Sequence, residues 1–219
     1  MRVHLTIKND KSTIVPYDNI PILVGTLHKW LGSNEWHNQL SYHSFSWLKG
    51  GTSGNGGLRF PKGAEWFISS YDITLIKKFI QGIQNDPTIN CGLTVNDITI
   101  QKDPEFKESQ SFTLASPVLI KRRDGEKTKH FLFSDKESDD LLTETLKTKL
   151  EKAGLNSSGV KISFNKEYHS PKTKLVNYNG IGNKASICPV TIKGSPEQIA
   201  FAWNVGIGNS TGIGFGALN

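Results

Sequence analysis

Hydrophobic and polar residues alternate along the first segment of the chain. Val3, Leu5 and Ile7 fall on one face of residues 2–8, which predicts a half-buried strand. Apolar residues then recur at helical spacing as far as Gly32, a residue suited to end a helix. The patterns that follow predict, in order, a strand at 42–48, a glycine-rich hairpin loop at 50–57, a strand at 64–70, a helix at 72–84 and one or two strands at 91–101.

The order strand, helix, strand, strand, helix, strand is that of the ferredoxin-like motif, an antiparallel sheet covered on one face by two helices. Residues 102–111 are polar and charged, which is typical of a linker. The pattern then begins again, with strands at 112–123, 128–133, 160–164, 175–178 and 186–192 and with helices capped by Ser134 with Glu137 and by Ser195 with Gln198. We therefore expect an α+β fold of two tandem ferredoxin-like (RRM-like) β-α-β-β-α-β domains, residues 1–111 and 112–219, the second with an added hairpin and a terminal glycine-rich loop.

Length and composition support a folded protein of one large or two small domains. The 219 residues are 36% hydrophobic and include five Trp and eleven Phe, which is sufficient for a core. The strand-like start differs from a signal peptide, and no stretch approaches the roughly 20 apolar residues of a membrane span. Cys91 and Cys188 lie in separate strand-like segments without metal-ligand spacing, which is typical of free thiols in a reducing compartment. We expect a cytoplasmic protein that does not enter a membrane.

The net charge is +6, and the basic excess lies in the second half: residues 1–111 carry 11 basic and 10 acidic residues, and residues 112–219 carry 15 and 10. Such an excess favours a polyanionic partner, although a surplus of this size is also common on soluble domains. Five basic residues gather at the tip of the hairpin predicted within residues 112–133: Lys121, Arg122, Arg123, Lys127 and Lys129. They are either solvated charges at a turn or a finger that grips phosphates.

The last stretch of the chain, residues 206–216, contains five glycines in eleven residues. Such a backbone adopts left-handed angles or lets another chain approach closely, and its N–H groups suit phosphate oxygens. The stretch lacks the Lys-Ser/Thr pair of a nucleotide-binding loop and does not open a helix as a dinucleotide-binding loop does. A flexible tail is the alternative, but Ile207, Ile213 and Phe215 punctuate the glycines and are costly in water. The candidate phosphate contacts here are Gly206, Gly208, Asn209, Ser210, Thr211, Gly212, Gly214 and Gly216.

Three patterns coincide: the terminal Gly212-Ile213-Gly214-Phe215-Gly216, His37 followed by Phe45-Ser46-Trp47-Leu48, and Ser116-Pro117 at the head of the second repeat. In this order they resemble, over nearly the whole chain, the repeat-processing endoribonucleases of CRISPR systems, which are members of the repeat-associated RNA-binding (RAMP) superfamily. The resemblance implies two tandem ferredoxin-like domains that bind precursor CRISPR RNA and cut it inside each repeat without a metal or other cofactor. In that reaction the ribose 2′-OH attacks the adjacent phosphate and leaves a 2′,3′-cyclic phosphate and a 5′-OH. The glycine-rich stretch and the basic hairpin would then hold the RNA backbone.

The resemblance also assigns site residues. The family's general acid or base is commonly a His shortly after the first helix, a place that His37 occupies, and a second family position inside that helix falls on His28. A Lys that supports the phosphate in the family falls on or near His43, so Lys29 and Lys49 are candidate substitutes. Imidazole titrates near neutrality and serves as base for the 2′-OH or as acid for the departing 5′-oxygen, so the two roles stay open. Catalysis by a single His, helped by substrate geometry, is equally open.

Each histidine also has a purely structural interpretation. His28 would interact with the negative end of its helix, His37 would be a surface turn residue and His43 would pack in an aromatic strand. A two-histidine phosphoesterase is excluded because His4-Leu5-Thr6 has no second matching pair. The remaining alternative is a non-catalytic RNA-binding RAMP subunit of a CRISPR effector complex, which would need the glycine-rich stretch and the basic hairpin but neither His28 nor His37. Other CRISPR-associated proteins and a second copy of the chain are further candidate partners.

Overall fold

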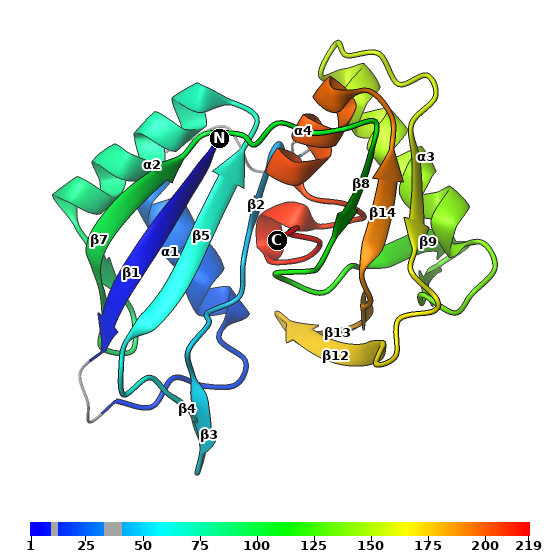
Figure 1. The fold of residues 1–219 in the computed structure, drawn as a ribbon. Coiled ribbons are helices and arrows are strands. Elements are labelled where there is room, and N and C mark those ends of the chain that lie inside the picture. Colours follow the sequence, from blue (N-terminus) through cyan, green and yellow to red (C-terminus); the bar gives the residue numbers. More distant parts are fainter. Residues whose placement is uncertain (10–12, 33–40) are drawn as a thin grey trace.

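The computed structural model describes residues 1–9, 13–32 and 41–219 (Figure 1). The alternating segment at the start of the chain forms the strand β1 (Arg2–Asn9) in the middle of an antiparallel sheet. The sheet contains, in spatial order, β2 (His43–Phe45), β5 (Ala64–Ser70), β1, β7 (Leu93–Gln101) and β6 (Thr88–Ile89). The first four of these strands have the order of a ferredoxin-like sheet.

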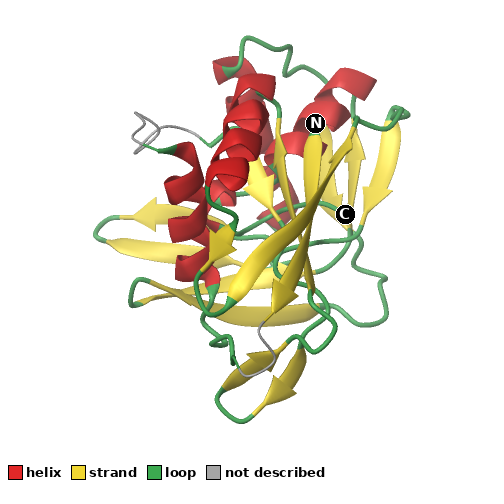
Figure 2. Cartoon of the chain, turned by 90° about the vertical axis from the view of Figure 1, so that its left-hand side faces the viewer, coloured by secondary structure: helices red, strands yellow, loops and turns green. Residues whose placement is uncertain are grey.

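Two helices cover one face of this sheet with their apolar stripes (Figures 1 and 2). They are α1 (Ile20–Leu31) and α2 (Ile73–Asn85). The helix α2 begins after Asp72, whose carboxylate accepts a hydrogen bond from the N–H of Thr74 at 2.8 Å. The helix α1 ends at Gly32, which has a φ of +69°. The predicted start of α2 and the predicted end of α1 are thereby confirmed.

The second half of the chain repeats this architecture on a smaller sheet. Its strands and helices, packed in one core, are β11 (Lys161–Phe164), β14 (Val190–Lys193), β8 (Ser109–Phe112), α3 (Ser138–Lys152) and α4 (Pro196–Val205). The helix α4 begins with the predicted capping box of Ser195 and Gln198. The end of the chain takes the place of the fourth strand and forms a bridge between Leu114 and Leu218. The protein therefore contains two tandem ferredoxin-like domains.

Three short hairpins extend from these domains. The first domain carries β3 (Thr52–Gly54) with β4 (Gly57–Arg59), and the second carries β9 (Ile120–Asp124) with β10 (Lys127–Phe131) and β12 (Lys172–Tyr178) with β13 (Ile181–Ile187). Among the described residues, no helix is long and apolar enough to cross a bilayer. Both cysteines are free thiols, Cys91 half-buried and Cys188 buried.

The strand predicted at 112–123 is wrong in extent, because the chain is interrupted between β8 and β9. At the interruption, Ser116 Oγ accepts a hydrogen bond from the N–H of Ala217 at 2.9 Å. The carbonyl of Pro117 accepts one from the N–H of Gly216 at 2.8 Å. Ser116 and Pro117 are therefore hydrogen-bonded to the end of the chain rather than to a neighbouring strand.

Two further expectations differ from the structure. The strand predicted at 186–192 is divided into β13 and β14, and Pro189 lies between them. The capping box predicted at Ser134 is wrong, because α3 begins at Ser138 and its N-cap Glu137 makes no side-chain cap hydrogen bond. The domain boundary expected after residue 111 falls inside β8, which pairs with β14 of the second sheet. This pairing favours a boundary before β8, and the division itself stays a prediction.

The two domains share a buried interface. Phe215 is fully buried and joins the core of the first domain together with Leu119 and Val176 of the second. The glycine-rich stretch at the end of the chain therefore lies between the domains, where Figure 1 shows the C-terminus. The alternative of a flexible tail is therefore wrong.

Candidate functional site

Two of the candidate histidines, one on α1 and one on β2, lie close to each other. His28 lies in the last turn of α1, and its carbonyl accepts a hydrogen bond from the N–H of Gly32 at 3.1 Å. His43 is the first residue of β2 and pairs with Ser70 of β5. Both imidazoles are half-buried, and His28 is close enough for its charge to lower the pKa of His43. Residues from two separate elements thus meet at one place.

The glycine-rich stretch closes over His43. Its short helical turn η1 (Thr211–Ile213) lies against both β2 and α1. A Cβ atom on Gly212 would overlap Ser41 Oγ and would lie 3.1 Å from His43 Cε1, so a glycine is needed for this approach. The imidazole of His43 is hydrogen-bonded to the backbone of Gly212. This contact holds the ring in one orientation.

A lysine that the sequence patterns did not single out completes the cluster. Lys149 of α3 is 3% exposed, and its Nζ donates to Thr211 Oγ1 at 3.2 Å and to the carbonyl of Gly206 at 3.4 Å. Burial lowers the pKa of Lys149 to about 7. The sequence contains one sign of this burial, because Lys149 continues the apolar stripe of Leu142 and Leu146 at helical spacing. A lysine on such a stripe is buried with the helix face.

The electrostatics of this cluster hold His43 in its neutral form. Its pKa is lowered to about 4, first by burial and then by the charges of His28 and Lys149, while the hydrogen bond to Gly212 opposes the shift. At neutral pH, His43 is therefore a neutral imidazole beside a lysine whose proton is held weakly. We name His28, His43 and Lys149 the interface cluster.

His37 lies outside the described residues, so its position stays a prediction. It belongs to the segment 33–40, which connects Gly32 to Ser41. Both of these flanking residues are close to the interface cluster, Gly32 through its hydrogen bond to His28 and Ser41 through its contact with Gly212.

The model of a protein family described as "CRISPR associated protein Cas6, C-terminal" matches residues 101–219, which is more than half of the chain. The chain belongs to the Cas6 family. A search of curated proteins found no match.

Solved structures share the fold over the whole length of the chain. "CRISPR associated protein Cas6" is 21% identical with a TM-score of 0.85, and the match covers 100% of this chain and 98% of that one. "An RAMP protein binding different RNA substrates" is 20% identical with a TM-score of 0.86 and the same coverage. A Cas6-related protein from Pyrococcus furiosus is 21% identical with a TM-score of 0.79, covering 100% and 97% of the two chains. At these identities the likeness establishes the fold of this Cas6 protein.

The two lysines expected to support catalysis lie in other surroundings. Lys29 Nζ pairs with the carboxylate of Asp86 at 2.9 Å, at the C-terminal end of α2. Lys49 Nζ donates to Asn219 Oδ1 at 3.1 Å and lines a cavity of about 340 Å³ with His4. Within the described parts of the chain, no group of three or more His, Cys, Asp or Glu side chains is arranged to hold a metal ion. The cation of the interface cluster is therefore Lys149.

The glycine-rich stretch of this Cas6 protein offers fewer open N–H groups than expected. The N–H groups of Gly206, Gly214 and Gly216 donate to carbonyls inside the fold, at 2.9, 3.3 and 2.8 Å. A Cβ on Gly208 would overlap the carbonyl of Leu119, at 2.5 Å. The expectation of a row of free donors is wrong for these residues, whose lack of a side chain serves close packing instead. The half-buried residues of the stretch are Asn209, Ser210, Gly212 and Ile213, whose contact with RNA remains a prediction.

The basic hairpin is present as β9 and β10, but its cations differ in their surroundings. Arg122 is bound to α3, since its Nη2 lies 2.9 Å from both Glu144 Oε2 and the carbonyl of Leu141. Lys129 Nζ lies 4.7 Å from the centre of the Phe131 ring. The other three cations are Lys121, which is half-buried, and Arg123 and Lys127, which are exposed. Arg122 therefore has a structural partner, whereas the exposed cations are available to a polyanion.

Proposed function

We propose that this Cas6 protein is an endoribonuclease that cuts precursor CRISPR RNA within its repeats without a metal ion, to make guide RNAs for antiviral defence. The observation that carries the proposal is the interface cluster. It gathers two imidazoles and a buried ammonium under the glycine-rich stretch, and Gly32 and Ser41, which flank the segment containing His37 in the sequence, lie close to it. The same groups are those that internal cleavage of RNA needs.

The reaction forms one bond and breaks one bond at phosphorus. The 2′-oxygen bonds to the adjacent phosphorus as a base removes its proton, and the bond from phosphorus to the 5′-oxygen breaks as an acid protonates that oxygen. The products are a 2′,3′-cyclic phosphate and a 5′-OH. Because both new charges in the transition state lie on oxygen atoms of one phosphate, a cation close to that phosphate lowers the barrier.

The electrostatics of the interface cluster suggest how the roles are divided. His43 is neutral at pH 7, so it can accept a proton but has none to give beyond the one in its hydrogen bond to Gly212. In this proposal His37 and His28 supply the acid and the remaining base function, and Lys149 supplies the positive charge in place of a lysine at position 43. Which of His37 and His28 is the acid is left to experiment.

RNA as the ligand is supported by solved structures of the same fold. One is a Cas6 product complex, 13% identical with a TM-score of 0.66, and another is the CRISPR endoribonuclease Cse3 bound to 19 nt RNA, 10% identical with a TM-score of 0.53. Arg123 and Lys127 on the basic hairpin are exposed and suited to the RNA backbone. The alternative function is a non-catalytic RNA-binding subunit. Binding to other CRISPR-associated proteins, a homodimer and a cytoplasmic location stay predictions.

Cleavage of the cognate repeat RNA in the presence of EDTA tests the proposal. We expect one cut, with a cyclic phosphate on the 5′ product identified by mass spectrometry. His37→Ala and His28→Ala should each slow the cut by about a hundredfold or more while RNA affinity persists. His169→Ala is the matched control, since this exposed histidine lies outside the interface cluster. Tight binding by the unmodified protein without any cleavage would favour the non-catalytic subunit instead.

A further inference from the structure

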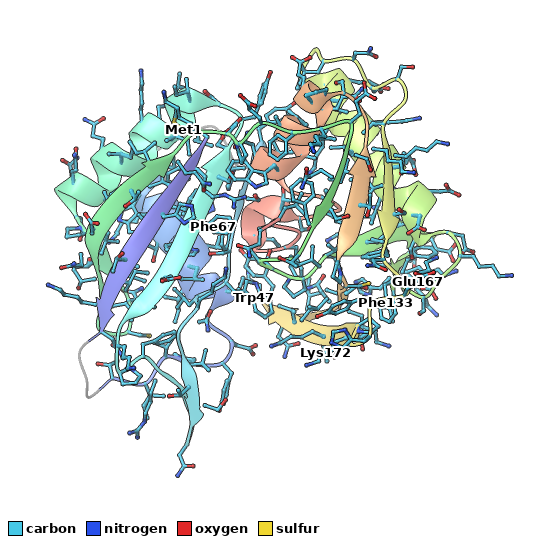
Figure 3. All side chains as sticks on the ribbon, in the orientation of Figure 1. Met1, Trp47, Phe67, Phe133, Glu167 and Lys172 are labelled. Carbon is cyan, nitrogen blue, oxygen red and sulfur yellow. The ribbon has the colours of Figure 1, made fainter. Side chains whose placement is uncertain are left out.

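A cavity of about 420 Å³ opens between the two domains at the N-terminal end of α1. The first domain lines it with Tyr17, Asn19 and Trp47, and the second lines it with Lys174 and Leu175 of β12. Figure 3 shows Trp47 between the domains, beside the hairpin that β12 forms with β13. The volume is in the range of pockets that hold a small organic ligand or one nucleotide.

Hydrogen bonds fix the two aromatic side chains of this cavity, of which Tyr17 is exposed and Trp47 half-buried. Tyr17 is 56% exposed, and its hydroxyl donates to the carbonyl of Gly54 at 3.0 Å. The indole N–H of Trp47 donates to the carbonyl of Gly214 at 2.8 Å. Rings held in place lose little entropy when a planar group stacks on them.

Two charged side chains line the cavity beside these rings, Lys174 of β12 and Asp18 before α1. Lys174 Nζ lies 4.8 Å from the centre of the Trp47 ring, close enough for a cation–π contact. The N-terminal end of α1 faces the same cavity through Asn19 and Ile20. The Asn19 side chain donates to the carbonyls of Pro16 and Tyr17 and does not cap the helix. The positive end of the helix dipole thus adds to the lysine, while the Asp18 carboxylate opposes both, so the Lys174 side of the cavity is the side suited to a phosphate.

The helix α1 and the glycine-rich stretch each extend from the cavity to the interface cluster. Ile20 starts α1 at the cavity and His28 lies eight residues further, which is about 12 Å along the helix axis. The glycine-rich stretch connects the same two places, since Gly214 binds Trp47 and Gly212 contacts His43. A single-stranded RNA that follows α1 from the interface cluster would reach the cavity within a few nucleotides.

We propose that this cavity binds one unpaired nucleotide of the repeat RNA, with its base stacked on Tyr17 and Trp47 and its phosphate beside Lys174. Aromatic platforms next to cations are the usual means by which proteins hold single-stranded bases. The inference rests on the proposed function for the identity of the ligand, but it concerns binding and not cleavage. The cavity is a subsite that positions the strand a few nucleotides from the scissile phosphate.

The test measures equilibrium binding of repeat RNA whose nucleotides are replaced one at a time by abasic residues. We expect one position, a few nucleotides from the cut, at which the abasic residue weakens binding to the unmodified protein about tenfold. Tyr17→Ala should weaken binding of intact RNA by about the same factor and should remove the effect of that abasic position. Tyr17→Phe keeps the ring and should bind almost as the unmodified protein does.

Two lysines of one strand supply the matched control for charge. Lys174→Ala should weaken binding and reduce its salt dependence, whereas Lys172→Ala, on the same strand but outside the cavity, should have a smaller effect. Unchanged affinity in Tyr17→Ala, with its unfolding midpoint intact, would overturn the inference and leave the cavity to a protein partner. Because only binding is measured, a protein that binds RNA without cutting it would refute the proposed function and leave this subsite standing.

Discussion

The domain interface holds two buried cations, Arg2 and Lys149, each 3% exposed, and their surroundings differ sharply. The guanidinium of Arg2 lies between the rings of Phe67 and Trp203, 3.8 and 3.7 Å from their centres. It donates to the carbonyl of Leu218 at 2.8 Å. Burial lowers the pKa of Arg2 to about 9, and the charge of Asp103 opposes this shift. Figure 3 shows Phe67 on the side of the first sheet that faces the second domain. Arg2 therefore has both stacking partners and a counter-charge.

Lys149 is buried to the same degree without stacking partners. Its hydrogen bonds to Thr211 and Gly206 are 3.2 and 3.4 Å long, and burial sets its lowered pKa. Among the described residues, no carboxylate pairs with Lys149. A buried charge without a counter-charge costs stability, so its presence beside His43 accords with the proposed reaction rather than with a role in folding. We propose that one cation joins the domains and that the other serves the site between them.

Replacing the first cation should have the largest effect on stability. Arg2→Leu leaves the carbonyls of Leu218 and Trp203 without their donor and removes two cation–π contacts. We expect the free energy of unfolding to fall by about 3 kcal/mol, measured by urea denaturation. Arg2→Lys keeps the charge and should lose part of this amount. A stability equal to that of the unmodified protein would mean that the stacked guanidinium does not hold the domains together.

Replacing the second cation should have the opposite effect on stability. In Lys149→Met the buried charge is gone and the volume is kept, so at pH 7 we expect unfolding free energy equal to or above that of the unmodified protein. RNA cleavage should fall at least about tenfold with little change in affinity, because the transition state loses its cation. Lys152→Met, an exposed lysine on the same helix, is the matched control and should change neither quantity.

The pH dependence of stability separates Lys149 from the other groups. Its folded pKa of about 7 lies below the usual 10.5, so between these values the unfolded chain binds more protons and stability rises with pH. Comparison with Lys149→Met isolates this rise, which should be missing from the variant between pH 7 and about 9, below the folded pKa of Arg2. An equal rise in both proteins would show that Lys149 is hydrated in solution.

The fold could largely be predicted from the sequence because its helices carry local signals. Asp72 and the pair Ser195 with Gln198 set helix starts by bonds within three residues, and those starts are confirmed. The break at Ser116 was not predictable, since its cause is a bond to Ala217 about a hundred residues away. Elements whose ends depend on hydrogen bonds between near neighbours can be predicted from the sequence, whereas a break that depends on the distant end of the chain cannot.

The site was predicted less completely for the same reason. The approach of Lys149 to His43 and His28 depends on a contact between the domains, which no spacing in the sequence reveals. The composition of the glycine-rich stretch is visible in the sequence, but the need for a glycine at 212 follows only from its contact with Ser41 and His43 in the folded structure. The helical position of Lys149 was the one local sign of its burial.

Replacing the surface lysine Lys29 should have the smallest effect on stability. Lys29 pairs with Asp86 while both side chains are well exposed, at 39% and 48%. Lys29→Ala should lower Tm by no more than about 2 °C, measured by thermal unfolding at pH 7, because exposed pairs contribute little. Hydrogen bonds from Lys29 first and then Thr88 hold the pKa of Asp86 well below its usual range. The small difference in Tm should therefore shrink as pH falls below the usual pKa of an aspartate.

Cleavage by Lys29→Ala should stay within about twofold of the unmodified protein, since Lys29 is engaged at the end of α2 and not with His43. Lys78→Ala, which lies in the same groove as Lys29, is the matched control. A loss of cleavage in Lys29→Ala as large as that in Lys149→Met would mean that Lys29 leaves Asp86 when RNA binds. The cation at the scissile phosphate would then come from the surface of the first domain, and the contrast between a structural and a catalytic buried cation would no longer explain Lys149.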